Sequence, residues 1–195
     1  MVAARRITSK TKIFQLKIQL ARISPPIWRR VLVPGEVDLG ELHAIIQSAF
    51  GWTDSHLHEF EVGLDRYGTP DPDWGRDDVA DESRVKLFRL AGEGEKFEYT
   101  YDFGDGWEHQ VAVEKVTAPE AGRRYPACTA GRRARPPEDV GGPWSYPDFC
   151  EAIKNPEHPE HEERLEWVGG SFDPDAFDLA ATDAALKYFA WTPLR

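Results

Sequence analysis

Apolar and polar side chains alternate near the start of the chain. Between residues 13 and 20, every second position is apolar: Phe14, Leu16, Ile18 and Leu20. A period of two is typical of a strand with one buried face. Ser24-Pro25-Pro26 interrupts the pattern, and a second extended run, from Ile27 to Val33, ends at Pro34-Gly35. We therefore predict two paired strands.

A helical pattern follows. Asp38 is a good N-cap, and apolar residues recur after it at i, i+3 and i+4 spacing, from Leu39 to Phe50. Gly51 stands where a glycine commonly ends a helix in the left-handed conformation. This spacing predicts an amphipathic helix over residues 39–50.

The middle of the chain predicts further strands. One runs from about Leu57 to Gly63, and two more, 97–101 and 109–113, flank the turn-forming residues 102–106. That arrangement predicts a hairpin. Residues 65–82, rich in Asp, Pro and Gly, read as a long acidic surface loop, followed by a short apolar turn at 85–90.

The last third of the chain predicts loops and helices. Residues 118–145 are rich in Pro and Gly and are expected to be mostly loop. Helices are predicted at 147–155, with Ser145 or Tyr146 near its cap, and at 159–168. A final helix at 174–189 would have Asp173 as N-cap and Pro174 at its first position. With no internal repeat, we expect one α+β domain over residues 13–195, after a disordered basic tail at 1–12.

The composition of the chain argues against several classes of protein. The chain of 195 residues has 24 basic and 34 acidic residues, a net charge of −10, which argues against a nonspecific nucleic-acid binder. Its 2 cysteines do not form a disulfide framework. The basic N-terminus lacks the apolar core of a signal peptide, and no apolar run is long enough to span a membrane. We expect a cytoplasmic protein without a membrane partner.

Two groups of arginines are local exceptions to the acidic character. Arg22, Arg29 and Arg30 form the first, and residues 123–135 contain the second. Either could hold a phosphate or a partner. Solvated surface is the more common state of arginine and is the favoured interpretation.

The segment Tyr101–His109 (YDFGDGWEH) has two interpretations. Asp102 and Asp105, with His109 just beyond, could bind a hard cation or orient a water molecule. Alternatively, both aspartates hydrogen-bond turn amides while Trp107 fills the core. Local chemistry alone favours the second interpretation.

His56 and His58 form the second candidate. Side chains at i and i+2 of a strand share a face, so both imidazoles could approach one metal. Further donors would have to arrive through the fold, from His109, Cys128 or an aspartate of the turn. A pair of this kind is weak evidence by itself.

The third candidate is the loop Arg135–Gly142 (RPPEDVGG). Prolines and glycines make it rigid enough to present Glu138 and Asp139 at the surface. Cys128, just upstream, could be a ligand or a nucleophile. A buried thiol that packs as a small apolar group is the favoured interpretation.

Together these segments resemble the plasmid pRiA4b ORF-3-like family. The likeness runs in order from about residue 13 to 190, through these motifs: ISPPIWRR (23–30), LGELH (39–43), AFGW (49–52), HLHEF (56–60), YDFGDGWEH (101–109), Cys128 with Gly131, PPEDVGG (136–142) with Tyr146, and FDP (172–174). The resemblance implies a single α+β domain with a mostly antiparallel, twisted, roll-like sheet packed against helices. It also implies an association with plasmids or mobile elements, since some relatives carry transposon-passenger or resolvase-type labels.

Three functional hypotheses follow. The favoured one is a module that binds a small ligand or a protein partner. The second is a metal-dependent hydrolase or nuclease-like enzyme with a divalent cation at His56, His58, His109 and Asp105. The third is an accessory protein of DNA transposition or recombination that uses the surface of Arg22, Arg29 and Arg30. The resemblance predicts one shared polar site, built from His56, His58, Asp102, Asp105, His109, Glu138 and Asp139.

Overall fold

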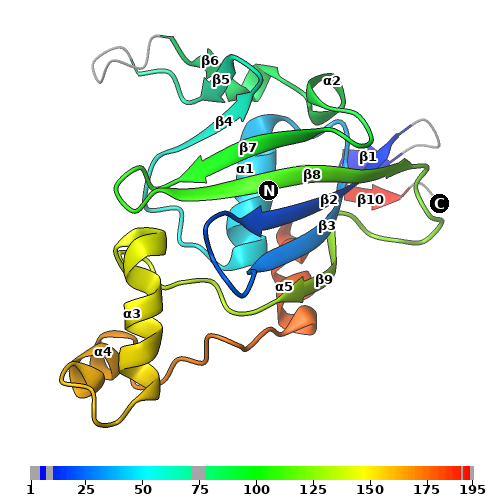
Figure 1. The fold of residues 1–195 in the computed structure, drawn as a ribbon. Coiled ribbons are helices and arrows are strands. Elements are labelled where there is room, and N and C mark those ends of the chain that lie inside the picture. The colour runs from blue at the N-terminus through cyan, green and yellow to red at the C-terminus, as the bar shows by residue number, and fades with distance from the viewer. Residues whose placement is uncertain (1–4, 8–10, 72–77, 190, 194–195) are drawn as a thin grey trace.

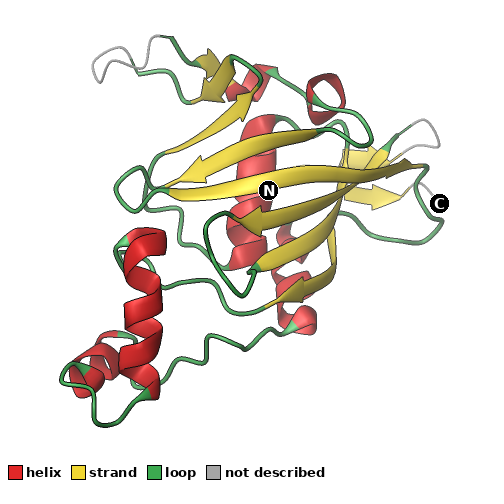
Figure 2. Cartoon of the chain, viewed as in Figure 1, coloured by secondary structure: helices red, strands yellow, loops and turns green. Residues whose placement is uncertain are grey.

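The computed structural model describes residues 5–7, 11–71, 78–189 and 191–193. Eight of the described strands form one open sheet, with helices behind it and a helical arm at one end (Figures 1 and 2). This architecture confirms the predicted α+β class with a mostly antiparallel sheet. Among the described residues, no helix is both long enough and apolar enough to cross a membrane.

The sheet has the strand order β6-β5-β4-β7-β8-β2-β3-β9, and all neighbours are antiparallel except β5 and β6. Its strands are β2 (Ile13–Leu20), β3 (Trp28–Pro34), β4 (His58–Val62), β5 (Asp65–Gly68), β6 (Ala80–Asp81), β7 (Lys96–Tyr101), β8 (Trp107–Thr117) and β9 (Ala127–Arg132). A separate pair, β1 (Arg5–Ile7) and β10 (Trp191–Pro193), is parallel. β1 lies inside the segment expected to be a disordered tail, and the division into tail and domain stays a prediction.

The helices lie on one side of the sheet or at its end. They are α1 (Leu39–Phe50), α2 (Leu87–Leu90), α3 (Gly142–Lys154), α4 (His161–Trp167) and α5 (Leu179–Ala185), with short 3₁₀ turns at Glu82–Arg84 and Leu186–Tyr188. In Figure 1, α1 and α5 lie behind the strands, while α3 and α4 extend from the end where β7 turns into β8. The core therefore lies between the sheet and α1.

The two faces of the sheet differ in polarity, as strand β2 and its neighbours show. Leu16, Ile18 and Leu20 are fully buried, as the alternation predicted. On the opposite face, polar groups pair with one another: Arg30 donates to Glu114 from Nε at 2.6 Å and from Nη2 at 2.8 Å. Only one face is needed for the core, so the other can carry charge.

Helix α1 begins and ends as predicted. Asp38 Oδ1 accepts from Glu41 N at 2.9 Å, and Glu41 Oε2 accepts from Asp38 N at 3.0 Å, which forms a capping box. Gly51, at φ 84°, donates its N–H to Gln47 O at 2.8 Å. The ends of α1 are thus fixed by local chemistry, and its apolar face lies against the sheet.

Two segments predicted as loops contain strands. Residues 65–82 include β5 and β6, and residues 118–145 include β9. Strand β9 reads Ala-Cys-Thr-Ala-Gly-Arg and has no apolar alternation. It is an edge strand paired only with β3, so backbone hydrogen bonding rather than hydrophobicity defines it.

The boundaries of two helices also differ from prediction. Helix α3 begins at Gly142 rather than at Pro147, which lies inside the helix. The last helix begins at Leu179, capped by Asp178, whose side chain accepts from Ala181 N at 2.9 Å; Asp173 is not its cap. Proline is common at the first position of a helix but does not require a helix to begin there. In both segments the proline therefore predicted the wrong first residue.

Candidate functional site

Two of the sequence motifs meet at the turn between β7 and β8. Asp105 Oδ2 accepts from Gly141 N at 3.2 Å. A Cβ atom on Gly142 would lie 2.1 Å from the backbone oxygen of Asp105, and Gly142 has φ +76°. Only glycine permits this approach. The turn 102–106 and the start of α3 therefore form one packed unit.

Asp102 organises the turn itself. Its Oδ1 accepts from Gly104 N at 2.9 Å and from Asp105 N at 3.3 Å. Trp107, just beyond, is 1% exposed and lies in the core. These contacts are the ones that the structural interpretation of Asp102 and Trp107 predicts. Asp105 differs from that interpretation, because it reaches across to α3 rather than to the amides of its own turn.

His56 lies between Asp102 and Asp139. Its Nε2 is 3.7 Å from Asp102 Oδ2 and 3.3 Å from Asp139 Oδ1. This nitrogen is shielded from solvent and has no hydrogen-bond partner in the described structure. The imidazole and the ring of Tyr101 form a T-shaped contact, with ring centroids 5.8 Å apart. Three loops thus bring one imidazole and two carboxylates together.

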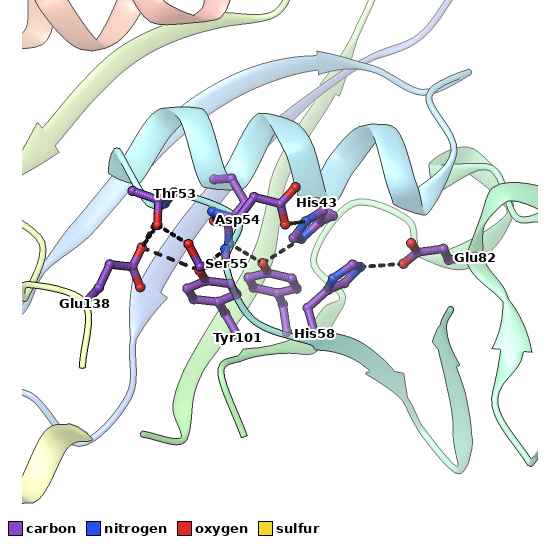
Figure 3. Close-up of polar contacts among 10 residues, drawn as sticks. His43, Thr53, Asp54, Ser55, His58, Glu82, Tyr101 and Glu138 are labelled. Atoms are coloured by element: carbon purple, nitrogen blue, oxygen red, sulfur yellow. Dashed lines mark hydrogen bonds and ion pairs between the residues drawn. The ribbon is translucent and has the colours of Figure 1, made fainter. Parts of the chain in front are cut away.

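His58 has different partners. Its ring stacks on that of His43, and its Nε2 lies 2.8 Å from Glu82 Oε2 (Figure 3). His56 precedes the first residue of β4, so the alternation of a strand does not govern its direction. The two histidines of the HLH motif therefore do not face one ligand as a strand pair would.

His43 belongs to a closed ring of hydrogen bonds with Asp54, Gln47 and Tyr99. Figure 3 labels His43 and Asp54. Asp54 N donates to Gln47 Oε1 at 3.1 Å, and Gln47 Nε2 donates to Tyr99 Oη at 2.8 Å. Burial raises the pKa of Tyr99 well above its usual value, so its hydroxyl keeps the proton. The carboxylate of Asp54 can only accept, so a neutral His43 donates from Nε2 to Asp54 Oδ1 at 2.8 Å, and its Nδ1 accepts from the Tyr99 hydroxyl at 2.8 Å.

Sequence reasoning did not select His43, Gln47 or Tyr99 as site residues. A signal was present, because His43 and Gln47 lie four residues apart within the apolar stripe of α1. Polar side chains on a buried helix face need hydrogen-bond partners. The spacing of His43 and Gln47 therefore already indicates that a polar group from another element packs against them.

Glu138 joins the loop before α3 to the residues after α1. Its Oε1 accepts from Thr53 N at 2.8 Å and from Thr53 Oγ1 at 2.9 Å, and it lies 3.4 Å from Tyr101 Oη (Figure 3). Its other oxygen, Oε2, is buried without a partner in the described structure. Burial raises the pKa of Tyr101. Glu138 thus retains one unused acceptor.

His109 is isolated from these groups. It is 1% exposed, its Nδ1 lies 3.2 Å from the carbonyl oxygen of Tyr99, and its ring meets Phe50 edge-on. Burial lowers the pKa of His109 to about 4. Among the described residues, the group whose ligand atoms lie within 4.8 Å of one another is His56, Asp102 and Asp139. The metal set predicted from sequence, His56 with His58, His109 and Asp105, is not brought together.

Cys128 is a buried thiol. It is 6% exposed, and its Sγ lies 3.5 Å from Ala130 O. Burial raises the pKa of Cys128, which disfavours the reactive thiolate. These findings support the interpretation of Cys128 as a small apolar group.

The three arginines that the third hypothesis requires, Arg22, Arg29 and Arg30, do not form one exposed basic surface. Arg29 is only 3% exposed. Arg22 pairs with Glu108 at 2.8 Å and Arg30 with Glu114 at 2.6 Å. Successive residues of β3 point to opposite faces of the sheet. Arg29 therefore points to the face of the sheet that the helices cover. It is not available on the surface that the hypothesis of DNA binding requires.

A pocket of about 640 Å³ adjoins Arg29. It lies between the end of α1, the segment 134–139 and the segment 167–182. Its apolar walls include Phe50, Trp167, Phe172 and Phe177, and its polar lining includes Arg29, Arg135, Glu138 and Asp139. Glu138 and Asp139 are therefore shared between this pocket and the polar groups around His56.

Comparisons with known proteins agree on the family of the chain. The family described as "Plasmid pRiA4b ORF-3-like protein" matches residues 12–181. The uncharacterized protein y4hQ of Sinorhizobium fredii (strain NBRC 101917 / NGR234) is 42% identical over 181 residues, which are 91% of this chain and 92% of that protein.

A solved structure has the same fold. It is the crystal structure of a protein of unknown function, MM3350, from Methanosarcina mazei Go1. The TM-score is 0.81 at 40% identity, over 87% of this chain and 97% of the other. These relatives establish the family and the fold, while their names state no activity.

Proposed function

The chain belongs to the plasmid pRiA4b ORF-3-like family, and we propose that it is a binding module for a small monocarboxylate with an apolar body. The ligand occupies the pocket lined by Arg29 and Phe177. One observation carries this proposal: the guanidinium of Arg29 is buried beside a pocket, and it has no carboxylate partner among the described residues.

The hydrogen bonds of Arg29 leave part of its guanidinium unused. Nε donates to Ala49 O at 3.0 Å, and Nη1 donates to Trp28 O at 2.9 Å and to Arg132 O at 3.1 Å. An arginine has five N–H donors, so both N–H groups of Nη2 have no acceptor within the described protein. All three acceptors are neutral carbonyls, and none compensates the positive charge.

Aromatic rings fix the plane of this guanidinium. Its Cζ lies 4.9 Å from the centroid of Phe50 and 4.6 Å from that of Phe177. Burial lowers the pKa of Arg29 to about 10, which still leaves the side chain charged at neutral pH. A buried cation without a counterion is unfavourable. A carboxylate accepting from Nη2 would relieve that cost.

Arg135 adds a second guanidinium to the same pocket. Its Nε donates to Gly51 O and its Nη1 to Pro136 O at 2.8 Å, and it forms no ion pair with the described residues. Burial lowers the pKa of Arg135 as well. Two cations held by backbone carbonyls favour an anionic group in the ligand.

The rest of the pocket limits what else the ligand carries. A volume of about 640 Å³ lies within the usual range of small-molecule sites, about 300–1,000 Å³. Phe172 and Trp167 supply apolar contact for a ring or a short alkyl chain. Glu138 and Asp139, which also line the pocket, repel a second anionic group.

Paired probes test the charge requirement. Phenylacetate and hexanoate, with phenylacetamide and hexanamide as uncharged analogues, are titrated into the protein while the Arg29 Nε–H signal is followed by NMR. We expect each carboxylate to bind at least about tenfold more tightly than its amide, a difference of about 1.4 kcal/mol. Equal affinity of acid and amide would contradict the proposal.

A matched pair of variants tests the location. Ala181 lines the pocket from α5, whereas Ala180 is exposed on the same helix and does not line it. Ala181→Phe should fill the pocket and abolish carboxylate binding, while Ala180→Phe should bind as the parent protein does. Both changes avoid the core, so thermal unfolding should stay close to that of the parent. Unchanged binding in Ala181→Phe would place the ligand elsewhere.

A further inference from the structure

Three side chains converge beside the pocket, and only one of them, Asp139, also lines it. His56 comes from the loop between α1 and β4, Asp102 begins the β7–β8 turn, and Asp139 lies in the loop before α3. One ligand atom from each lies within 4.8 Å of the others, and no further group of this kind occurs among the described residues.

The contacts within this cluster are incomplete. His56 Nε2 is buried from solvent, yet neither carboxylate is placed to form a hydrogen bond with it. Asp102 uses Oδ1 for two turn amides, and its Oδ2 makes no hydrogen bond with the described residues. The side chain of Asp102 is only 8% exposed. Among the described lysines, arginines and histidines, His56 is the one within ion-pair distance of it.

The spacing fits a bound cation better than direct pairing. Around zinc, ligand bonds are about 2.0–2.2 Å long, so neighbouring ligand atoms of a tetrahedral site lie about 3.3–3.6 Å apart. The distances from His56 Nε2 are 3.3 Å to Asp139 and 3.7 Å to Asp102. A cation would satisfy the orphaned nitrogen and both carboxylates together.

We propose that His56 Nε2, Asp102 Oδ2 and Asp139 Oδ1 form a binding site for a divalent first-row transition-metal ion. The imidazole favours zinc over calcium or magnesium, which take oxygen ligands, and the two carboxylates also suit manganese. The side chain of Asp139 is 70% exposed, which gives the ion a route from solvent. Three protein ligands leave a coordination position open for water or another small ligand.

This inference stands apart from the proposed carboxylate binding. Asp139 lines the pocket as well, so an ion here would sit at the rim of the pocket. The metal site, however, needs neither Arg29 nor a carboxylate ligand. Each proposal can therefore fail without the other.

The test is metal binding to the full chain in the absence of any carboxylate. Isothermal titration with Zn²⁺ at pH 7.5 and Mn²⁺ electron paramagnetic resonance are measured on the parent, His56→Gln and Asp139→Asn. His158→Gln and Asp148→Asn are controls, because both residues lie outside the cluster. His158→Gln also reports whether zinc binds adventitiously near His158 and His161.

We expect one equivalent of Zn²⁺, with affinity at least tenfold weaker in His56→Gln and Asp139→Asn and unchanged in both controls. Bound Mn²⁺ should broaden the His56 ring signals selectively. Asp139 is exposed, so its variant should fold normally and remain informative even if His56→Gln does not. Absence of binding, or equal affinity in Asp139→Asn, would overturn the inference and leave only the contacts between His56 and the two aspartates.

Ala181→Phe separates the two proposals. This change should abolish carboxylate binding and leave Zn²⁺ affinity within twofold of the parent. Loss of Zn²⁺ binding in Ala181→Phe would contradict the assignment of the ion to the three residues around His56.

Discussion

The imidazole rings of His43 and His58 stack face to face, with centroids 3.4 Å apart and planes 6° from parallel. Each ring also meets a carboxylate: His43 Nε2 lies 2.8 Å from Asp54 Oδ1, and His58 Nε2 lies 2.8 Å from Glu82 Oε2. Two imidazoles in contact repel one another when both are charged. The stack therefore favours a state in which at least one ring is neutral.

The first prediction concerns the protonation of His43. Burial and then the neighbouring His58 lower the pKa of His43, and the hydroxyl of Tyr99 donates to its Nδ1. We expect a neutral His43 at pH 7 with the proton on Nε2, titrating below the usual value of about 6.5. Long-range ¹H–¹⁵N NMR correlations distinguish the tautomers. A proton on Nδ1 would mean that the hydrogen-bond ring runs in another direction.

The second prediction concerns the stability that this ring provides. Tyr99→Phe removes the hydroxyl and leaves His43 Nδ1 and Gln47 Nε2 without their buried partner. We expect a loss of about 1–3 kcal/mol in the free energy of unfolding, measured by urea denaturation. Tyr188→Phe is the control, because Tyr188 is 91% exposed, and its effect should stay within about 0.5 kcal/mol.

A smaller loss in Tyr99→Phe would have a specific meaning. It would show that water or a rearranged Gln47 replaces the hydroxyl. A double-mutant cycle with Gln47→Leu measures this directly, since two coupled residues give a non-additive sum.

The parts of the fold that local chemistry determines were predictable from the sequence. The N-cap at Asp38 and the left-handed Gly51 were both confirmed, because a cap is a relation between residues three or four positions apart. Strand β2 was predictable for the same reason, since burial of one face imposes a period of two. Strand β9 was not, because pairing with β3 over about a hundred residues defines it.

The candidate site shows the same limit. Sequence placed His56, Asp102 and Asp139 in the site, but it could not tell which histidine of HLH would reach the aspartates. The start of β4 at His58 decides that, and it depends on pairing with Tyr101 of β7. Arg29 was assigned to a surface for a similar reason, because the face to which a β3 side chain points depends on the register of the whole sheet.

The third prediction tests the contact between the turn and α3. In Gly142→Ala, the new Cβ would lie 2.1 Å from Asp105 O, at φ +76°. Backbone must move to relieve this overlap, so we expect a loss of about 3 kcal/mol or more in the free energy of unfolding. Thermal or urea denaturation measures it.

Gly169→Ala is the matched control for that change. Gly169 also has a positive φ, +82°, but nothing lies within 4 Å of a Cβ placed there. Its loss should therefore be limited to the backbone strain of about 1 kcal/mol. Equal losses in the two variants would show that φ alone, and not the approach to Asp105, requires glycine at position 142.

The last prediction concerns acid stability and His109. Burial lowers the pKa of His109 to about 4 in the folded protein, whereas an unfolded histidine titrates near about 6.5. Between these values the unfolded chain binds more protons than the folded one, so stability falls as pH falls. The loss approaches about 1.4 kcal/mol per pH unit and totals about 3 kcal/mol by pH 4, below which His109 contributes no further dependence. In His109→Gln, the slope of unfolding free energy against pH between about 4.5 and 6 should decrease. The decrease should correspond to the uptake of nearly one proton on unfolding. Because the slope is independent of any constant loss of stability in the variant, an unchanged slope would mean that His109 is protonated inside the folded protein.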